Sequence, residues 1–210
     1  MAYLVLVRHG KSEWNVLGKW TGLTDVNLAP EGIDEARRMG ALIRDIDIAK
    51  IHVSKLKRAH QTLHEIITAL GAQHIAADAH EALNERDYGI YTGKNKWQIK
   101  ETMTDEEFHN IRRGWDAMVL EGENLKDVYA RVIPYYREHI LPQLLAGHNV
   151  LVVAHGNSLR ALVKHLEQIS DEKISNFEFN FGEVYCYEFD AYGKIVGKDI
   201  RSANSAPLKH

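Results

Sequence analysis

Two short apolar runs in this chain end in the same pattern, His-Gly-x-Ser, and this repetition restricts the fold more than any other feature. Residues 3–7 lead into Arg8-His9-Gly10-Lys11-Ser12, and residues 150–154 lead into His155-Gly156-Asn157-Ser158. Five-residue aliphatic runs are typical of strands that are buried on both faces of a parallel sheet. Ligands bind outside the carboxyl ends of such strands. The pattern therefore predicts two neighbouring strands that bring two imidazoles to one pocket, each followed by a helix-capping serine.

Helical patterns separate the predicted strands, which indicates an α/β fold: a three-layer sandwich with a mostly parallel central sheet flanked by helices. We expect a single domain over residues 1–200 and a flexible tail over 201–210. The further predicted strands are 51–54, 184–189 and 194–200. The predicted helices start at Pro30 or cover 55–70, 123–145 (interrupted or bent at Pro134 and Pro142) and 158–168.

Composition argues against several classes of partner. The formal net charge is −3, from 26 Lys and Arg against 29 Asp and Glu, which gives no electrostatic case for nucleic acid or an anionic membrane. No apolar stretch approaches the roughly 18 to 20 residues of a membrane span, and the N-terminus does not resemble a signal peptide. The single cysteine, Cys186, is expected to be a buried thiol. We expect a cytoplasmic protein.

The first strand end carries the residues of a phosphoryl-transfer site. A neutral imidazole such as His9 is a good nucleophile that can form a covalent intermediate. Arg8 supplies a planar, charged donor group that suits phosphate, and Gly10 lets backbone and ligand approach closely. If His155 lies beside His9, it could stabilise charge during transfer. Each histidine, taken alone, also fits a strand-end residue with a structural role.

Charged residues between the two strand ends could complete such a site. Arg58, near the start of a predicted helix, would add a second guanidinium where a helix N-terminus attracts anions. Glu85 is a candidate general acid or base for a leaving alkoxide. Lys96 with Arg112 and Arg113 could hold a second anionic group. Each of these charges, taken alone, also fits a solvated surface.

Several short motifs occur together in this chain and carry a family resemblance over about residues 3–190. They are Val7-Arg8-His9-Gly10, Ser12, Trp14-Asn15, Thr21-Gly22, Leu56-x-Arg58-Ala59, Leu83-Asn84-Glu85-Arg86-x-Tyr88-Gly89, Asn95-Lys96, Arg112-Arg113-Gly114-Trp115 and His155 to Leu162. The combination resembles the histidine phosphatase superfamily. More narrowly, it resembles the 2,3-bisphosphoglycerate-dependent phosphoglycerate mutases, in a compact form, since the segment from Arg113 to Asn124 is short.

The resemblance implies a role for each matching position. His9 would be the phosphohistidine nucleophile, Glu85 the proton donor and acceptor, and His155 a stabiliser of the transition state. The transferring phosphoryl group would also be held by Arg8, Asn15 and Arg58, with the backbone of Gly156 and Asn157 nearby. The glycerate carboxylate and the second phosphate would be held by Thr21, Gly22, Tyr88, Lys96, Arg112 and Arg113. Two further substrate-binding positions would be Ser12 and Arg86.

The activity that the resemblance implies is interconversion of 3-phosphoglycerate and 2-phosphoglycerate in glycolysis and gluconeogenesis. Phosphohistidine at His9, primed by 2,3-bisphosphoglycerate, would carry the phosphoryl group without a metal. The partner would be this small-molecule substrate, and a homo-oligomer is possible. Two alternatives stay open. One is a phosphatase of the same superfamily acting on a small phosphorylated metabolite. The other is a non-catalytic binding protein, which would be expected to lack His9, Glu85 or His155.

The chain also departs from the family pattern at a few places. Lys11 stands where Glu is usual, and Asp87 where His or Tyr is common. Both are expected to flank the pocket and to affect substrate affinity rather than the phosphohistidine chemistry. Residues 118–120 and 181–184 also depart from the family pattern. The departure at residues 181–184 is expected to alter a late loop that helps close the site.

Overall fold

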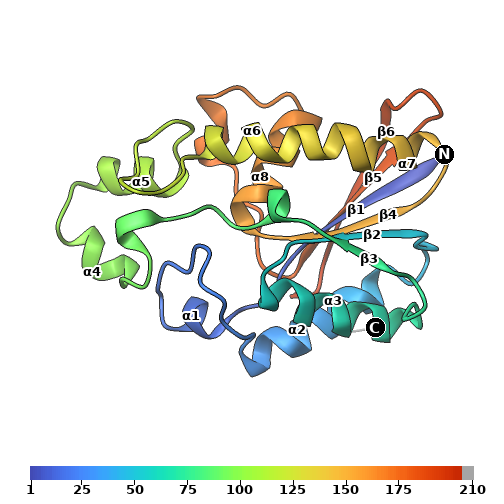
Figure 1. The fold of residues 1–210 in the computed structure, drawn as a ribbon, viewed down its shortest axis with the longest axis horizontal. Coiled ribbons are helices and arrows are strands. Elements are labelled where there is room, and N and C mark those ends of the chain that lie inside the picture. The colour runs from blue at the N-terminus through green and yellow to red at the C-terminus, as the bar shows by residue number, and fades with distance from the viewer. Residues whose placement is uncertain (205–210) are drawn as a thin grey trace, which may run out of the picture.

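A six-stranded sheet forms the centre of the computed structural model, which describes residues 1–204 (Figure 1). The strand order is β3-β2-β4-β1-β5-β6. The first four of these strands run parallel, whereas β5 and β6 are antiparallel to their neighbours. The predicted mostly parallel sheet is therefore confirmed. The bounds are β1 Ala2–Arg8, β2 Lys50–Val53, β3 Ala77–Ala79, β4 Val150–Ala154, β5 Glu183–Phe189 and β6 Ile195–Ser202.

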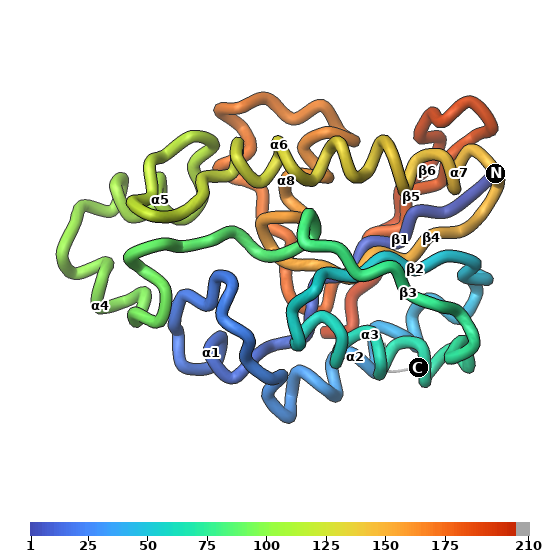
Figure 2. Tube along the Cα trace, in the orientation of Figure 1, coloured from blue at the N-terminus to red at the C-terminus, as the bar shows by residue number. Residues whose placement is uncertain are grey.

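Helices cover both faces of the sheet, which confirms the predicted three-layer sandwich (Figures 1 and 2). On one face lie α2 (Pro30–Leu42) and α3 (Lys57–Leu70). The other face is covered by α6 (Leu125–Tyr135), a π-helix (Tyr136–Ile140), α7 (Leu141–Leu145) and α8 (Gly156–Leu166). Within residues 1–204, no helix is long and apolar enough to cross a membrane.

The remaining helices lie beyond the carboxyl ends of β1 and β4, at the opposite end of the molecule from the N-terminus (Figure 1). They are short, and apart from α1, which follows the expected cap Ser12, the sequence patterns did not predict them. They comprise α1 (Glu13–Val16), α4 (Lys96–Lys100), α5 (Asp105–Arg113) and the 3-10 turns Glu81–Leu83, Gly89–Tyr91 and Lys173–Asn176.

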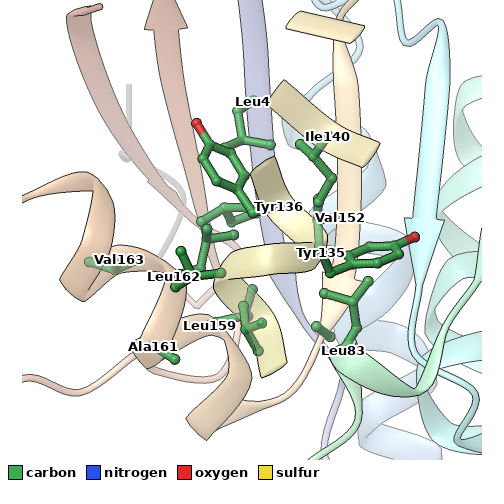
Figure 3. Close-up of a cluster of buried hydrophobic side chains, with 14 of the residues drawn as sticks. Leu4, Leu83, Tyr135, Tyr136, Ile140, Val152, Leu159, Ala161, Leu162 and Val163 are labelled. Atoms are coloured by element: carbon green, nitrogen blue, oxygen red, sulfur yellow. The ribbon is translucent and has the colours of Figure 1, made fainter. Parts of the chain in front are cut away.

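Strand β1 separates the two hydrophobic cores. Successive side chains of a strand point to opposite faces. Leu4 and Leu6 accordingly pack with α6 and α8, as the close-up of that core shows for Leu4 (Figure 3). Val5 and Val7 pack with α2 and α3 on the other face. All four side chains have no exposed surface, so the strand that leads into His9 is packed tightly from both sides.

The register of β1 against β4 brings the two His-Gly motifs together. Arg8 pairs with Ala154, and the N–H of His9 donates to the carbonyl of Ala154 at 2.9 Å. His9 and His155 therefore leave neighbouring parallel strands at the same level. The prediction of two imidazoles at one sheet edge is confirmed.

Several predicted boundaries were wrong. Ser12 caps α1 as expected, but Ser158 is the third residue of α8, and its hydroxyl instead accepts the N–H of the N-cap residue His155. Helix α3 begins at Lys57 rather than at residue 55. Strand β6 continues to Ser202, so residues 201 and 202 belong to the sheet and not to a tail. The rest of the expected tail, from 205 onward, lies outside the described residues.

Candidate active site

Two buried imidazoles lie side by side at the carboxyl edge of the sheet, with their ring planes tilted by 55°. The ring centroids of His9 and His155 are 4.9 Å apart, and the two residues are 2% and 0% exposed. Burial, followed by the charges of Arg58 and Arg8, holds the pKa of His9 well below its ordinary value. Burial, followed by the charge of Arg58, does the same for His155. Both side chains are therefore neutral at physiological pH, as a histidine nucleophile requires.

Hydrogen bonds select the tautomer of each ring. The Nδ1–H of His9 donates to the carbonyl of Gly10 at 2.7 Å, which leaves Nε2 with a free lone pair. His155 Nε2 lies 2.6 Å from the Ser54 hydroxyl, which already accepts the N–H of Leu56. The hydroxyl can therefore donate its proton to His155 Nε2, and in that tautomer Nδ1 carries the imidazole proton. His9 can act as a nucleophile while His155 donates to a phosphoryl oxygen.

Two arginines flank the imidazoles. Arg58 is fully buried on α3 and donates to the carbonyls of Thr24 and Gly22, at 3.0 and 2.9 Å. Burial lowers its pKa to about 10, so it remains charged. Arg8 donates from Nη1 to the carbonyl of Phe179 at 2.7 Å. The Nε–H of each arginine keeps no partner in the described part of the chain, and these donors are free for an anion.

A strongly cationic cavity lies next to this pair: Arg8 and Gly156, the chain neighbours of His9 and His155, line it, but the two imidazoles do not. Five cations and two carboxylates contribute to its wall, which suits a ligand with more than one negative group. Burial, followed by the charge of Arg112, lowers the pKa of Lys96 to about 8. The lining residues are Arg8, Trp20, Glu85, Tyr88, Lys96, Arg112, Arg113, Gly156, Asn157, Arg160, Glu178 and Phe179.

Glu85 faces this cavity with one oxygen already occupied. Its Oε1 accepts the backbone N–H of Arg86 at 2.8 Å, and both the N–H and the side-chain amide of Asn157 at 3.2 and 3.0 Å. The amide of Asn157 is oriented in turn by Arg160, whose Nη1 donates to its Oδ1 at 2.9 Å. Oε2 has no such partner, so Glu85 can exchange a proton with a substrate hydroxyl.

Buried donors and hydroxyls without partners gather around the same place. Within residues 1–204, every buried side-chain nitrogen or oxygen that lacks a hydrogen bond belongs to the site or its immediate support. Buried polar groups are nearly always paired, so a cluster of unpaired ones indicates a missing ligand. The atoms are Arg8 Nε, Trp20 Nε1, Thr21 Oγ1, Arg58 Nε, Arg86 Nε and Nη1, Thr92 Oγ1 and His155 Nδ1.

Several predicted site residues surround the cavity without lining it. Ser12 and Asn15 bond to one another as the N-terminal cap of α1. Thr21 and Gly22 lie in the loop that Arg58 holds, where Gly22 has a φ of 54°. Arg86 is fully buried, lies over the ring of Tyr88 at 4.5 Å and donates to the Ile111 carbonyl. These residues shape the walls of the pocket.

The two single-residue departures from the family pattern lie outside the cavity wall. The Lys11 side chain is exposed, and its backbone N–H donates to Glu35. The carboxylate of Asp87 accepts the N–H of Gly89, which closes a turn. Neither residue lines the cavity, although Tyr88, next to Asp87 in the chain, does.

Some site residues were missed because only the fold reveals them. Trp20, Arg160, Glu178 and Phe179 line the cavity, and Glu178 forms an ion pair with Arg113. Arg160 was visible in the second His-Gly motif, but nothing in one sequence connects it to Glu85. In the described residues, no three His, Cys, Asp or Glu side chains are grouped so that they could hold a metal ion.

Comparison with known sequences gives one family model and many curated relatives. The model of the histidine phosphatase superfamily (branch 1) matches residues 4–198. A 2,3-bisphosphoglycerate-dependent phosphoglycerate mutase of Azorhizobium caulinodans is 44% identical over 199 residues, covering 93% of this chain and 96% of that protein. A second such mutase, of Lactiplantibacillus plantarum, is 38% identical over 226 residues, covering 95% and 98%. This alignment is longer than the chain, so that relative carries inserted residues, in line with a compact form here.

Solved structures share the architecture. Bacillus stearothermophilus YhfR has a TM-score of 0.78 at 25% identity, covering 93% of this chain and 94% of its own. A mycobacterial glucosyl-3-phosphoglycerate phosphatase in complex with VO3 has a TM-score of 0.81 at 20% identity, covering 98% and 100%. The second likeness concerns the fold alone.

Proposed function

Because the chain belongs to the histidine phosphatase superfamily and, within it, to the 2,3-bisphosphoglycerate-dependent phosphoglycerate mutases, we propose that it interconverts 3-phosphoglycerate and 2-phosphoglycerate. The observation that carries the proposal is the pair of neutral imidazoles beside a cavity with five cations. A monophosphorylated glycerate has a phosphate and a carboxylate, so it needs charge neutralisation at two places.

In this mechanism, Nε2 of His9 carries the phosphoryl group between the two substrate oxygens. His155 Nδ1 and the free Nε–H groups of Arg8 and Arg58 neutralise the phosphoryl oxygens during transfer. Glu85 takes the proton of the attacking hydroxyl and returns it to the leaving alkoxide. When His9 takes up the phosphoryl group, a P–O bond breaks and a P–N bond forms. When His9 passes the group on, the P–N bond breaks and a new P–O bond forms. Neither step requires a metal.

The buried, unpaired donors fit 2,3-bisphosphoglycerate, which would supply the phosphoryl group that first loads His9. Lys96, Arg112 and Arg113 would hold the phosphate that does not react, and they lie on α4 and at the end of α5. Burial is the largest cause of the lowered pKa of Lys96, and repulsion by Arg112 is the second. A bound phosphate would relieve this repulsion.

The proposal is tested with purified protein and 3-phosphoglycerate, with and without catalytic 2,3-bisphosphoglycerate. Formation of 2-phosphoglycerate and release of free phosphate are measured in the same samples. We expect cofactor-stimulated 2-phosphoglycerate with little phosphate. Phosphate release without 2-phosphoglycerate would instead identify a phosphatase. His9→Ala should abolish both activities and the acid-labile label on the protein, whereas His60→Ala, at an exposed position of α3, should retain them.

A further inference from the structure

The guanidinium of Arg8 packs against two neighbours. The centre of the Phe181 ring is 3.7 Å from its Cζ. The second neighbour is Gly156, where an added Cβ would lie 3.3, 3.4 and 3.5 Å from Cζ, Nη2 and Nε. These nearly equal distances place Gly156 over the guanidinium plane rather than at its edge. The Phe181 ring and Gly156 therefore both pack against the guanidinium.

This arrangement fixes the plane of the guanidinium and leaves only its edge for hydrogen bonds. One edge position, Nη1, donates to the carbonyl of Phe179 at 2.7 Å. Another, Nε, is buried and has no partner within residues 1–204. A cation over an aromatic face is held electrostatically as well as by packing. Phe181 therefore helps to aim an unused donor of Arg8.

Phe181 also covers the nucleophile. Two rings lie beside His9: His155 at 4.9 Å and Phe181 at 5.9 Å, the latter edge-on. His155 is fully buried and Phe181 is partly exposed, so of these two rings Phe181 is the one that reaches solvent. Its loop is anchored near the end of the chain, since Asn204 donates to the Phe181 carbonyl at 2.9 Å and to Glu35 at 3.2 Å.

We propose that Phe181 is a specificity-determining residue that protects phosphorylated His9 from water and thereby favours transfer to glycerate over hydrolysis. The inference rests on the proposed phosphohistidine chemistry. In the competing hydrolysis, the water oxygen bonds to phosphorus, and the P–Nε2 bond breaks with its electron pair remaining on Nε2. One water proton passes to Glu85 and the other stays on the released hydrogen phosphate. Removing the Phe181 ring opens a route for that water.

The test loads His9 with labelled phosphate from 2,3-bisphosphoglycerate, removes excess cofactor and follows loss of label from the protein. The same preparations are assayed for the ratio of free phosphate to 2-phosphoglycerate. Phe181→Ala should shorten the half-life of the phosphoenzyme several-fold and raise this ratio. Phe181→Leu keeps an apolar cover and should stay close to the unmodified protein. Phe177→Ala is the matched control, because it removes a partly buried ring of the same segment that packs against the core instead.

The outcomes separate this inference from the proposed function. A half-life unchanged in Phe181→Ala, with label present at full occupancy, overturns the role of Phe181 and leaves the proposed function intact. Equal shortening in Phe177→Ala also overturns it, because the effect would then belong to the loop as a whole. Absence of label on the unmodified protein overturns the proposed function, and the inference with it.

Discussion

At the scale of single residues, the site is organised to keep two imidazoles uncharged among guanidinium groups. Burial is the largest cause of the low pKa of both histidines, and the neighbouring arginines add to it. A lowered pKa means that the neutral form persists as pH falls through the ordinary histidine range. In the proposed mechanism, the arginines that neutralise the phosphoryl group would therefore also keep Nε2 of His9 available for attack.

Glu85→Gln should lower kcat by about 100-fold or more, the usual size of a general acid–base contribution, with a much smaller change in KM. The amide oxygen of Gln can still accept the three N–H groups that now bond to Oε1, so binding geometry should survive. Initial rates over a range of 3-phosphoglycerate concentrations measure both constants. Glu81→Gln, at an exposed position of the preceding turn, is the control. An unchanged kcat in Glu85→Gln would show that Glu85 does not transfer the proton.

Lys96 should impose an alkaline limit on substrate binding. Its pKa is lowered to about 8, so the cation is present below that pH and is lost as pH rises through it. We expect kcat/KM to fall above pH 8 in the unmodified protein, and Lys96→Arg to remove this fall because guanidinium stays protonated. Quenched samples analysed for 2-phosphoglycerate give the profile directly. Lys94→Arg, at a nearby exposed position, should keep the fall in kcat/KM above pH 8. Loss of that fall in Lys94→Arg would argue that Lys96 is not its cause.

The residues whose chemistry can be predicted from sequence are those that follow strand ends. His9 and His155 each follow a five-residue apolar run, and parallel pairing then brings them together without further information. Phe181 and Trp20 could not be assigned in this way, because their contacts with Arg8 and Tyr88 come from loops whose paths depend on the whole fold. Packing between distant segments leaves no local pattern.

At the scale of elements, Arg160 connects α8 to the segment that follows it. Its guanidinium donates to the carbonyls of Phe177, Arg113 and Ile174, and also to Asn157. Burial lowers its pKa to about 9, but it remains charged at neutral pH. The buried side chain of Arg160 thus connects Asn157 of α8, whose amide orients Glu85, to the end of α5.

Arg160→Met should reduce both stability and turnover. Each buried carbonyl that loses its donor costs about 1–3 kcal/mol, so the melting temperature should fall by several degrees. Well below that temperature, kcat should still fall more than KM rises, because Asn157 no longer holds Glu85 in place. Circular dichroism melts and steady-state kinetics on the same samples measure the two effects. Arg137→Met is the exposed control. Lost stability with an unchanged kcat would limit Arg160 to a structural role.

Elements with a strong apolar pattern were predictable, and the weakly patterned ones were not. The predicted strands at 3–7 and 150–154 match β1 and β4 within a residue or two, because they are buried on both faces. Strand β3, Ala77–Ala79, was missed since it is three exposed residues at the edge of the sheet. The predicted 123–145 helix passes through Pro134 and changes to a π-helix at Tyr136, an adjustment within the predicted segment.

At the scale of the whole molecule, the unpaired donors should couple ligand binding to global stability. At a concentration about 100 times Kd, a ligand that binds only the folded state adds about 2.7 kcal/mol. For a chain of this size, that raises the melting temperature by about 5–10 °C. His9→Ala with 2,3-bisphosphoglycerate isolates binding from chemistry. Sodium chloride at equal ionic strength is the control. An equal rise of the melting temperature with this salt alone would show that 2,3-bisphosphoglycerate is not bound specifically.

The position of β1 between β4 and β5 has a consequence for how the protein is made. His9 directly follows β1, yet β1 pairs with residues 150–154 and 184–189, which are translated long after it. Contacts between such distant segments form late, because a long loop must first close. A nascent or truncated chain that ends before residue 184 therefore lacks one neighbour of β1. His9 therefore gains its full framework only after β5 has been translated, and the proposed phosphoryl transfer should be restricted to chains that contain β5.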